Sequence, residues 1–151
     1  MILKKNRPMI TVDLHILLIR DSQVFMLRRY NTGYEDGKYS LPAGHLEENE
    51  TAKEGALREA KEEIGVMIKS TNLMLVLTLH SYTNSARIAL FFQALEWYGE
   101  PTNMEPEKCD FADWFPVNSP PENTVAYIRE ALSMISMGET YGEFGWTHHQ
   151  N

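Results

Sequence analysis

Cysteine and long apolar runs are both scarce in this chain. Its single cysteine, Cys109, excludes an intrachain disulfide, and this scarcity predicts a reducing, cytoplasmic location. No stretch approaches the roughly 20 consecutive apolar residues of a membrane-spanning helix, so we expect no membrane partner. Residues 1–10 also lack an apolar run long enough for a signal peptide.

Positive charge is in deficit, with 14 lysines and arginines against 21 aspartates and glutamates and a net charge of −7. A nucleic acid polymer calls for a basic surface, so this balance argues against such a partner. A small anionic substrate remains compatible with it, because a bound metal ion can screen phosphates locally. The 151 residues suffice for one domain with a real core, and we expect a single domain over residues 1–151.

Apolar periodicity and turn residues predict an α/β (α+β) fold in which a mixed β-sheet has helices on both faces. The predicted strands are residues 9–20, 24–29, 39–43, 73–80, 86–97 and 111–117. The predicted helices are residues 51–64 and 122–137, and Cys109 falls in a predicted loop, 98–110. The tail, residues 138–151, has no clear pattern, and its His148 and His149 are expected to be disordered.

The first helix is the best-defined element in the sequence. Thr51 and Glu54 fit a capping box at its start, and Gly65 fits a stop at its end. One side carries an apolar stripe that can pack on a sheet, made by Leu57, Ala60 and Ile64.

Another side of the same helix gathers Glu59, Glu62 and Glu63, which lie close together because residues three and four apart share a face. Like charges at this spacing destabilise a bare helix, and a divalent cation removes that penalty. Oxygen ligands without histidine or cysteine favour Mg²⁺, or Mn²⁺ as a substitute, over Zn²⁺. Arg58 can hold one of the carboxylates in place. The alternative is an ordinary solvated helix face.

The pattern around this helix resembles the complete Nudix box. Gly44 is followed after five residues by Glu50, and after seven more by the run Arg58-Glu59-Ala60-Lys61-Glu62-Glu63-Ile64-Gly65-Val66, so every specified position of the box at residues 44–66 is filled. The resemblance implies a Nudix-type α/β/α sandwich and a hydrolase of nucleoside diphosphates linked to another moiety. It also implies a small-molecule nucleotide as partner, and it allows a homodimer.

The resemblance further implies roles for single residues. Glu62 and Glu63 would be the main metal ligands, Glu59 a further ligand or the group that orients the water, and the Gly44 carbonyl a ligand from the preceding loop. Glu50 would pair with Arg58, or would coordinate through water. In this family the general base can come from the loop before the last strand.

That loop offers three acids, Glu105, Glu107 and Asp110, of which we favour Glu105 as the base. The alternative for each is a solvent-facing loop acid.

Weaker features favour a nucleoside triphosphate as substrate, as in MutT-type members. Asn123 matches an asparagine that hydrogen-bonds the base, or else it caps the following helix. Arg28 matches an arginine near the nucleotide, or else it is an exposed strand-end charge. His45 follows the first box glycine and is a candidate phosphate contact, and His80 ends a strand near the expected cleft.

Trp114 and Phe115 could stack on a base or belong to the core. Two departures from family patterns bear on the substrate. Ser40 stands where MutT-type enzymes can carry an acid, which weakens the case for an oxidised guanine nucleotide. Ser81 and Tyr82 stand where ADP-ribose-cleaving relatives often have proline, although a tyrosine there is compatible with a dinucleoside polyphosphate.

Three activities therefore stay open. The first is Mg²⁺-dependent cleavage of a nucleoside triphosphate to the monophosphate and diphosphate, with a dinucleoside polyphosphate or ADP-ribose-type substrate as its alternative. The second is isomerisation of an isoprenyl diphosphate, for which no cysteine is suitably placed. The third is nucleotide sensing without cleavage, which the complete set of box carboxylates disfavours.

Overall fold

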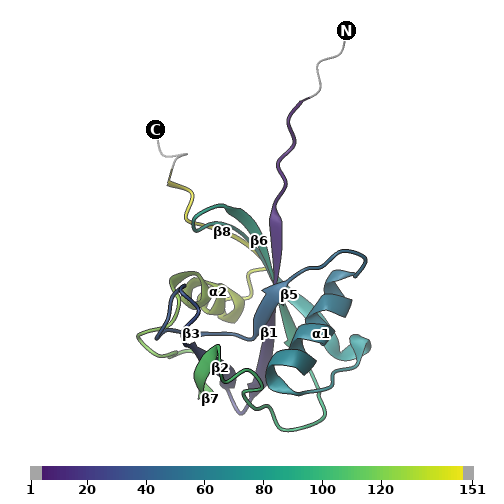
Figure 1. The fold of residues 1–151 in the computed structure, drawn as a ribbon, viewed down its shortest axis with the longest axis vertical. Helices are drawn as coiled ribbons and strands as arrows, with labels where there is room; N and C mark the ends of the chain where they lie inside the picture. The colour runs from purple at the N-terminus through teal and green to yellow at the C-terminus, as the bar shows by residue number, and fades with distance from the viewer. Residues whose placement is uncertain (1–4, 148–151) are drawn as a thin grey trace.

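A mixed β-sheet with one helix on each face forms the computed structural model, which describes residues 5–147 (Figure 1). The strands are β1 (Thr11–Arg20), β2 (Gln23–Arg29), β3 (Tyr39–Ser40), β4 (Ala43–His45), β5 (Leu73–Tyr82), β6 (Ala86–Ala94), β7 (Cys109–Pro116) and β8 (Tyr141–Phe144). The helices are α1 (Ala52–Ile64) and α2 (Ala126–Ser136), with a short 3₁₀ turn at Ser70–Asn72. The expected α/β fold with a mixed sheet is confirmed.

The strands follow the order β3-β2-β1-β6-β5-β8, while β4 also pairs with β1 and β7 with β2. The pairs β1–β6 and β5–β8 are parallel, and the other pairs are antiparallel. Strand β1 is shared by two parts of the sheet: its first half pairs with β4, and its last two residues form a hairpin with β2. This sharing brings α1, which follows β4, against the middle of the sheet.

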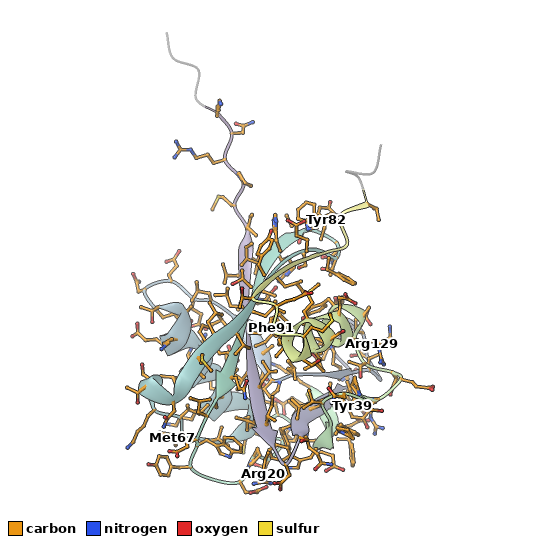
Figure 2. The ribbon with its side chains drawn as sticks, turned by 180° about the vertical axis from the view of Figure 1, so that it is seen from behind. Arg20, Tyr39, Met67, Tyr82, Phe91 and Arg129 are labelled. Carbon is orange, nitrogen blue, oxygen red and sulfur yellow. The ribbon has the colours of Figure 1, made fainter. Side chains whose placement is uncertain are left out.

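Strand β1 is buried on both faces, which explains its nearly continuous apolar sequence. Leu14, Ile16 and Leu18 point into the cluster that α1 covers, whereas Leu17 points into the cluster that α2 covers. Phe91 of β6 lies fully buried at the centre of the α2 side (Figure 2). Each such side chain contributes about 1.5–3 kcal/mol by leaving water, so β1 is a main source of stability.

Helix α1 begins and ends where its sequence signals predict. The Thr51 side chain accepts a hydrogen bond from the Glu54 amide, and the Glu54 side chain accepts one from the Thr51 amide. Gly65 closes the helix in the left-handed conformation with φ of 70°. Ala60 and Ile64 are buried against the sheet, so the acidic side of the helix faces away from the core.

Helix α2 begins at Ala126, so the prediction of a start at residue 122 is wrong. The segment before it pairs with β3 instead: the Tyr39 amide donates to the Asn123 carbonyl, and the Val125 amide donates to the Tyr39 carbonyl. A backbone held in this extended bridge cannot also be helical. The N-cap is Val125, which excludes the helix-capping alternative for Asn123.

The prediction of a patternless tail after residue 138 is also wrong, because residues 141–144 form β8 along β5. The strand is short and contains Gly142, whose missing side chain leaves room for the Met134 side chain of α2. This segment is extended because it pairs with the outer edge of β5, and the local sequence contains no pattern that predicts this pairing. The prediction for His148 and His149 lies outside the described residues.

Other bounds shift by a few residues. The stretch predicted as one strand at 39–43 is two short strands, β3 and β4, separated at Leu41 and Pro42. Strand β6 ends at Ala94 rather than at residue 97. Cys109 is the first residue of β7 rather than part of a loop, because it lies opposite Arg29 of β2 in the sheet. Its backbone carbonyl accepts a hydrogen bond from the Asn103 side-chain amide. Within residues 5–147, the helices are too short or too polar to cross a membrane.

Candidate functional site

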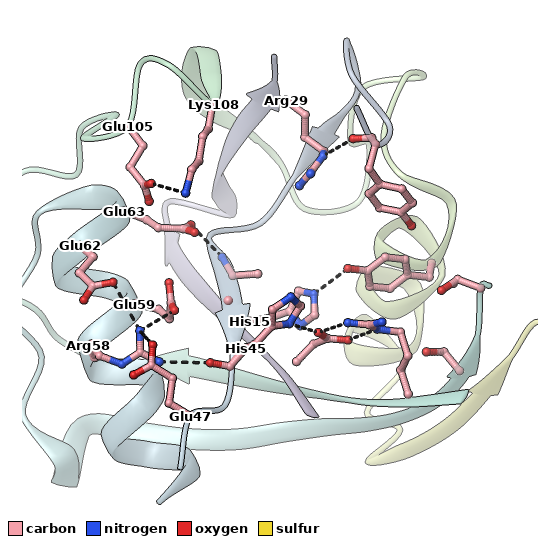
Figure 3. Close-up of a pocket in the computed structure, with 18 of the residues that line it drawn as sticks. His15, Arg29, His45, Glu47, Arg58, Glu59, Glu62, Glu63, Glu105 and Lys108 are labelled. Atoms are coloured by element: carbon pink, nitrogen blue, oxygen red, sulfur yellow. Dashed lines mark hydrogen bonds and ion pairs between the residues drawn. The ribbon is translucent and has the colours of Figure 1, made fainter. Parts of the chain in front are cut away.

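A cavity of about 820 Å³ lies between α1 and the sheet (Figure 3). One side of it, the acidic wall, is lined by Glu47, Arg58, Glu59, Glu62, Glu63 and Glu105. The other side, the opposite wall, is lined by Asp13, His15, Arg29, Arg87 and Tyr127. Between the walls run Ala43, Gly44 and His45 of β4. The volume lies within the range usual for sites that bind small molecules.

Arg58 is the centre of the acidic wall. Its guanidinium donates through Nε and Nη2 to both carboxylate oxygens of Glu50, at 3.0 and 2.8 Å. It also donates through Nη1 to Glu59, at 2.7 Å, and to Glu62, at 3.4 Å. The predicted Glu50–Arg58 pair is thus present. The hydrogen bonds from Arg58 lower the pKa of Glu50 to about 2, so Glu50 is a permanent anion at neutral pH.

Glu59 lies against strand β4 at Gly44. It is only 8% exposed, and a Cβ atom at Gly44 would overlap its carboxylate. Burial raises the pKa of Glu59, although its contact with Arg58 opposes the shift. Glycine at position 44 therefore allows a carboxylate to lie beside the backbone of β4.

Glu63 points into the cavity one turn after Glu59, where it accepts a hydrogen bond from the Ala43 amide at 2.9 Å. Burial raises its pKa to about 8, and the nearby charges of Glu59 and Glu105 act in the same direction. Glu105 reaches the same wall from the loop before β7 and pairs with Lys108 at 3.1 Å. Glu62 lies at the mouth, with its side chain 57% exposed.

The acidic wall suits a hard cation. Its side chains offer carboxylate oxygens, which Mg²⁺ and Mn²⁺ prefer as ligands. The pKa of Glu63 is raised because the side chain is buried beside other negative charges. Within residues 5–147, no three acidic, histidine or cysteine side chains converge at ligand distance. Arg58 instead bridges Glu59 and Glu62.

Side chains of the opposite wall form two hydrogen-bonded groups. Arg87 of β6 donates to both oxygens of Asp13, at 2.7 and 2.8 Å, and His45 shares one of these oxygens through Nδ1 at 2.8 Å. His15 is fully buried, stacks on Phe91 and meets the Tyr127 hydroxyl through Nε2 at 2.9 Å. Burial lowers the pKa of His15 to about 4, so the ring is neutral at physiological pH.

Sequence reasoning missed every residue of this wall, although it named His45 of β4, which contacts Asp13. One signal was available: Asp13 and His15 are polar residues two apart in an otherwise apolar strand, so they share one face of it. The partners Arg87 and Tyr127 come from β6 and α2, more than 70 residues away in the chain.

Several predicted substrate contacts lie outside the cavity. Arg28 pairs with Asp110 at 2.8 Å, and its neighbour Arg29 lines the cavity instead, because successive strand residues face opposite ways. Asn123 donates its side-chain amide to the Gly37 carbonyl at 2.8 Å.

The aromatic candidates are also elsewhere. Trp114 packs on Phe25 and under the Arg20 guanidinium, and Phe115 packs on Tyr39 in the core. His80 contacts Trp146 rather than the cavity.

Similarity to known proteins extends over most of the chain. The NUDIX domain family matches residues 9–133. An 8-oxo-dGTP diphosphatase from Proteus vulgaris is 30% identical over 90 residues, which are 60% of this chain and 80% of that protein. An NAD-capped RNA hydrolase NudC from Pseudomonas entomophila is 28% identical over 117 residues, or 78% of this chain but 40% of that protein. An ADP-ribose pyrophosphatase from Methanocaldococcus jannaschii is 34% identical over 76 residues, 48% of this chain and 43% of that protein.

Solved structures share the fold. A MutT NUDIX hydrolase from Burkholderia pseudomallei superposes with a TM-score of 0.76 at 22% identity, covering 83% of this chain and 98% of that one. A MutT protein from Methanosarcina mazei Go1 gives a TM-score of 0.72 at 20% identity, covering 84% and 93%.

Proposed function

The chain belongs to the NUDIX domain family and is a Nudix hydrolase acting on nucleoside diphosphate derivatives, and from this premise we propose that it cleaves nucleoside triphosphates to nucleoside monophosphate and diphosphate. One observation carries the proposal: Glu59, Glu62 and Glu63 of the box line a cavity of substrate size. The fourth box carboxylate, Glu50, is bound by Arg58, which also donates to Glu59 and Glu62. The net charge of −7 supports a small nucleotide rather than a nucleic acid polymer.

In this proposal Glu59, Glu62, Glu63 and the Gly44 carbonyl would hold Mg²⁺. The chemistry supplied by that ion is charge screening on the diphosphate and a lower pKa for the attacking water. Arg58 and Glu50 act as positioning residues, because their two-pronged contact fixes the helix side chains against β4. His45, exposed at the centre of the cavity, is oriented by Asp13 to contact a phosphate oxygen.

Glu105 accepts the proton of the attacking water in this proposal, since it faces the cavity and is held by Lys108. Arg29, rather than Arg28, faces the bound anion, because its guanidinium lines the cavity and no carboxylate among the described residues lies within ion-pair distance of it. Asn123 receives no substrate contact, because its amide is engaged with Gly37.

A diphosphate that joins two larger groups is the second candidate. It is favoured by the similarity to the NudC and ADP-ribose pyrophosphatase proteins. This chain spans less than half the length of each of those two relatives. A sensing module without activity is disfavoured by the intact acidic wall.

A panel of nucleoside triphosphates, dinucleoside polyphosphates and ADP-ribose, incubated with Mg²⁺ and analysed by chromatography, tests the proposal. Cleavage in ¹⁸O-labelled water with ³¹P NMR locates the attacked phosphorus. We expect monophosphate and diphosphate from the triphosphates, and no product after chelation of the metal.

Two variants sharpen this test. Glu62→Gln should lower kcat by about 1,000-fold or more while keeping the fold, because Glu62 is exposed yet would bind the ion. Glu130→Gln, at an exposed position on the other helix, should keep full activity. Equal activity of Glu62→Gln and the unaltered protein would refute the metal assignment.

A further inference from the structure

A smaller pocket adjoins the cavity on the side away from the acidic wall. It measures about 250 Å³ and shares Tyr34, Thr83, Asn84 and Tyr127 with the cavity, so the two spaces are neighbours. Tyr82 and Phe144 complete its aromatic lining. We infer that this side pocket binds the nucleobase of the substrate, with Tyr34 as the stacking surface; the inference rests on the proposed function.

The loop that carries Tyr34 is internally braced. The Asp36 carboxylate accepts hydrogen bonds from the Thr32 amide at 3.0 Å, the Thr32 hydroxyl at 2.5 Å and the Gly33 amide at 2.8 Å. Arg29 donates through Nε to the Tyr34 carbonyl at 2.7 Å. The backbone next to the tyrosine is therefore held from two sides.

Tyr34 nevertheless remains 43% exposed where it lines both spaces, with the Arg29 guanidinium 5.3 Å from the centroid of its ring. A half-exposed aromatic ring on a braced loop is costly to leave in water and loses little entropy when a ligand covers it. This combination suits a binding surface better than it suits a packing element.

The side of this pocket across from Tyr34 is formed in part by strand β8. Phe144 of β8 pairs with Ser81, and the Trp146 indole donates to the His80 carbonyl at 2.8 Å. Trp146 also contacts the Tyr82 ring, with centroids 5.3 Å apart. Tyr82 lies at the end of the sheet beside this segment and is 41% exposed (Figure 2).

The lining matches the chemistry of a heterocyclic base. Aromatic faces stack on any base, while the Thr83 hydroxyl and the Asn84 amide can pair with its polar edge. The one carboxylate of the pocket, Glu35, is paired with Lys38 at 2.7 Å. The volume lies below the range for drug-sized ligands, so it suits one ring system rather than a whole nucleotide.

The charged part of the substrate then lies in the main cavity. Arg29, which braces the loop, also lines that cavity and joins the two halves of the site. Figure 3 shows Arg29 across the cavity from Glu62 and Glu63, so a bound nucleotide would span the space between them.

Binding is measured by calorimetry in Mg²⁺ with two probes, each carrying an α,β-methylene bridge that prevents cleavage at that bond. One is a nucleoside triphosphate analogue, and the other is the corresponding ribose 5′-triphosphate analogue, which has no base. We expect Tyr34→Leu to raise the Kd of the nucleotide by about tenfold or more, the usual effect of losing one stacked ring, and to leave the ribose probe unchanged. Tyr34→Phe, which keeps the ring, should restore tight nucleotide binding.

Tyr30→Leu is the matched control, since this exposed tyrosine begins the same loop but lies outside both spaces. Tyr82→Leu provides a second test of the pocket should Tyr34→Leu fail to fold. Unchanged nucleotide affinity in Tyr34→Leu, or in Tyr82→Leu if Tyr34→Leu does not fold, overturns the inference. Equal affinity of the unaltered protein for the two probes overturns it as well. Failure to cleave nucleotides with base-dependent binding intact would instead overturn the proposed function alone.

Discussion

The two walls of the cavity are each organised by one arginine, but the arginines gather their partners from different distances along the chain. Arg58 binds Glu50, Glu59 and Glu62, all within eight residues of it. Arg87 binds Asp13, which lies 74 residues away and in turn orients His45. Apart from Glu105, the acidic wall is thus local in the sequence, whereas the Arg87–Asp13 contact of the opposite wall exists only after β1 and β6 have paired.

The comparison predicts that Arg58 matters more for activity than Arg87 does. Arg58→Met should lower kcat/KM by about 10–100-fold, the usual effect of removing a residue that positions metal ligands, because Glu59 and Glu62 lose their common partner. It should also lower Tm by several degrees. Steady-state kinetics and thermal unfolding measure both effects, and Arg58→Lys should restore little, because lysine lacks the two-pronged geometry.

Glu63 should make the stability of the metal-free protein depend on pH. Its pKa of about 8 in the folded protein lies above its value in the unfolded chain, so the folded state binds the extra proton. The stabilisation is full below about pH 4.5 and is lost as the pH rises through about 8, amounting to a few kcal/mol.

Urea unfolding in chelator at pH 5, 7 and 9 should therefore show falling stability for the unaltered protein and a weaker fall for Glu63→Gln. Parallel curves for the two proteins would contradict the assignment of this dependence to Glu63.

Arg87→Met should act on stability more than on catalysis. It leaves the largely buried Asp13 without its main partner, which costs about 2 kcal/mol, less than the 3–5 kcal/mol of a fully buried pair because both side chains keep some contact with water. We expect kcat to fall less than in Arg58→Met. A larger loss of kcat in Arg87→Met would reverse the distinction between the walls.

Tyr127→Phe should have the smallest effect. It removes the hydroxyl that meets His15 Nε2 and leaves the packing intact, which costs about 1 kcal/mol. Chemical denaturation measures the change, and unaltered stability would show that His15 finds another partner.

The features that the sequence allowed us to predict are those made by residues close together in the chain. Helix α1 and its capping box were predictable because every signal for them lies within residues 51–65. The Glu50–Arg58 pair was one of two roles for Glu50 that the resemblance to the Nudix box implied. The start of α2 was misplaced because Tyr39 holds the preceding segment in an extended bridge. Strand β8 was missed because its pairing with β5 is its only reason to be extended.

The sequence alone could not decide whether Arg28 or Arg29 faces the cavity. Both end one strand, and only the phase of that strand relative to the sheet decides which of them faces the cavity. Asp13 and His15 were visible as polar residues in an apolar strand, but their partners were not.

Strand β8 also decides where another extended chain could attach to this protein. It occupies the outer edge of β5 from Thr78 to Ser81 and so closes that stretch to strand addition. Farther along the same edge, Met74 and Leu75 are each 47% exposed, and among residues 5–147 no strand pairs with them on that side. The outer edge of β5 is therefore covered beside the side pocket and left open at the end remote from it.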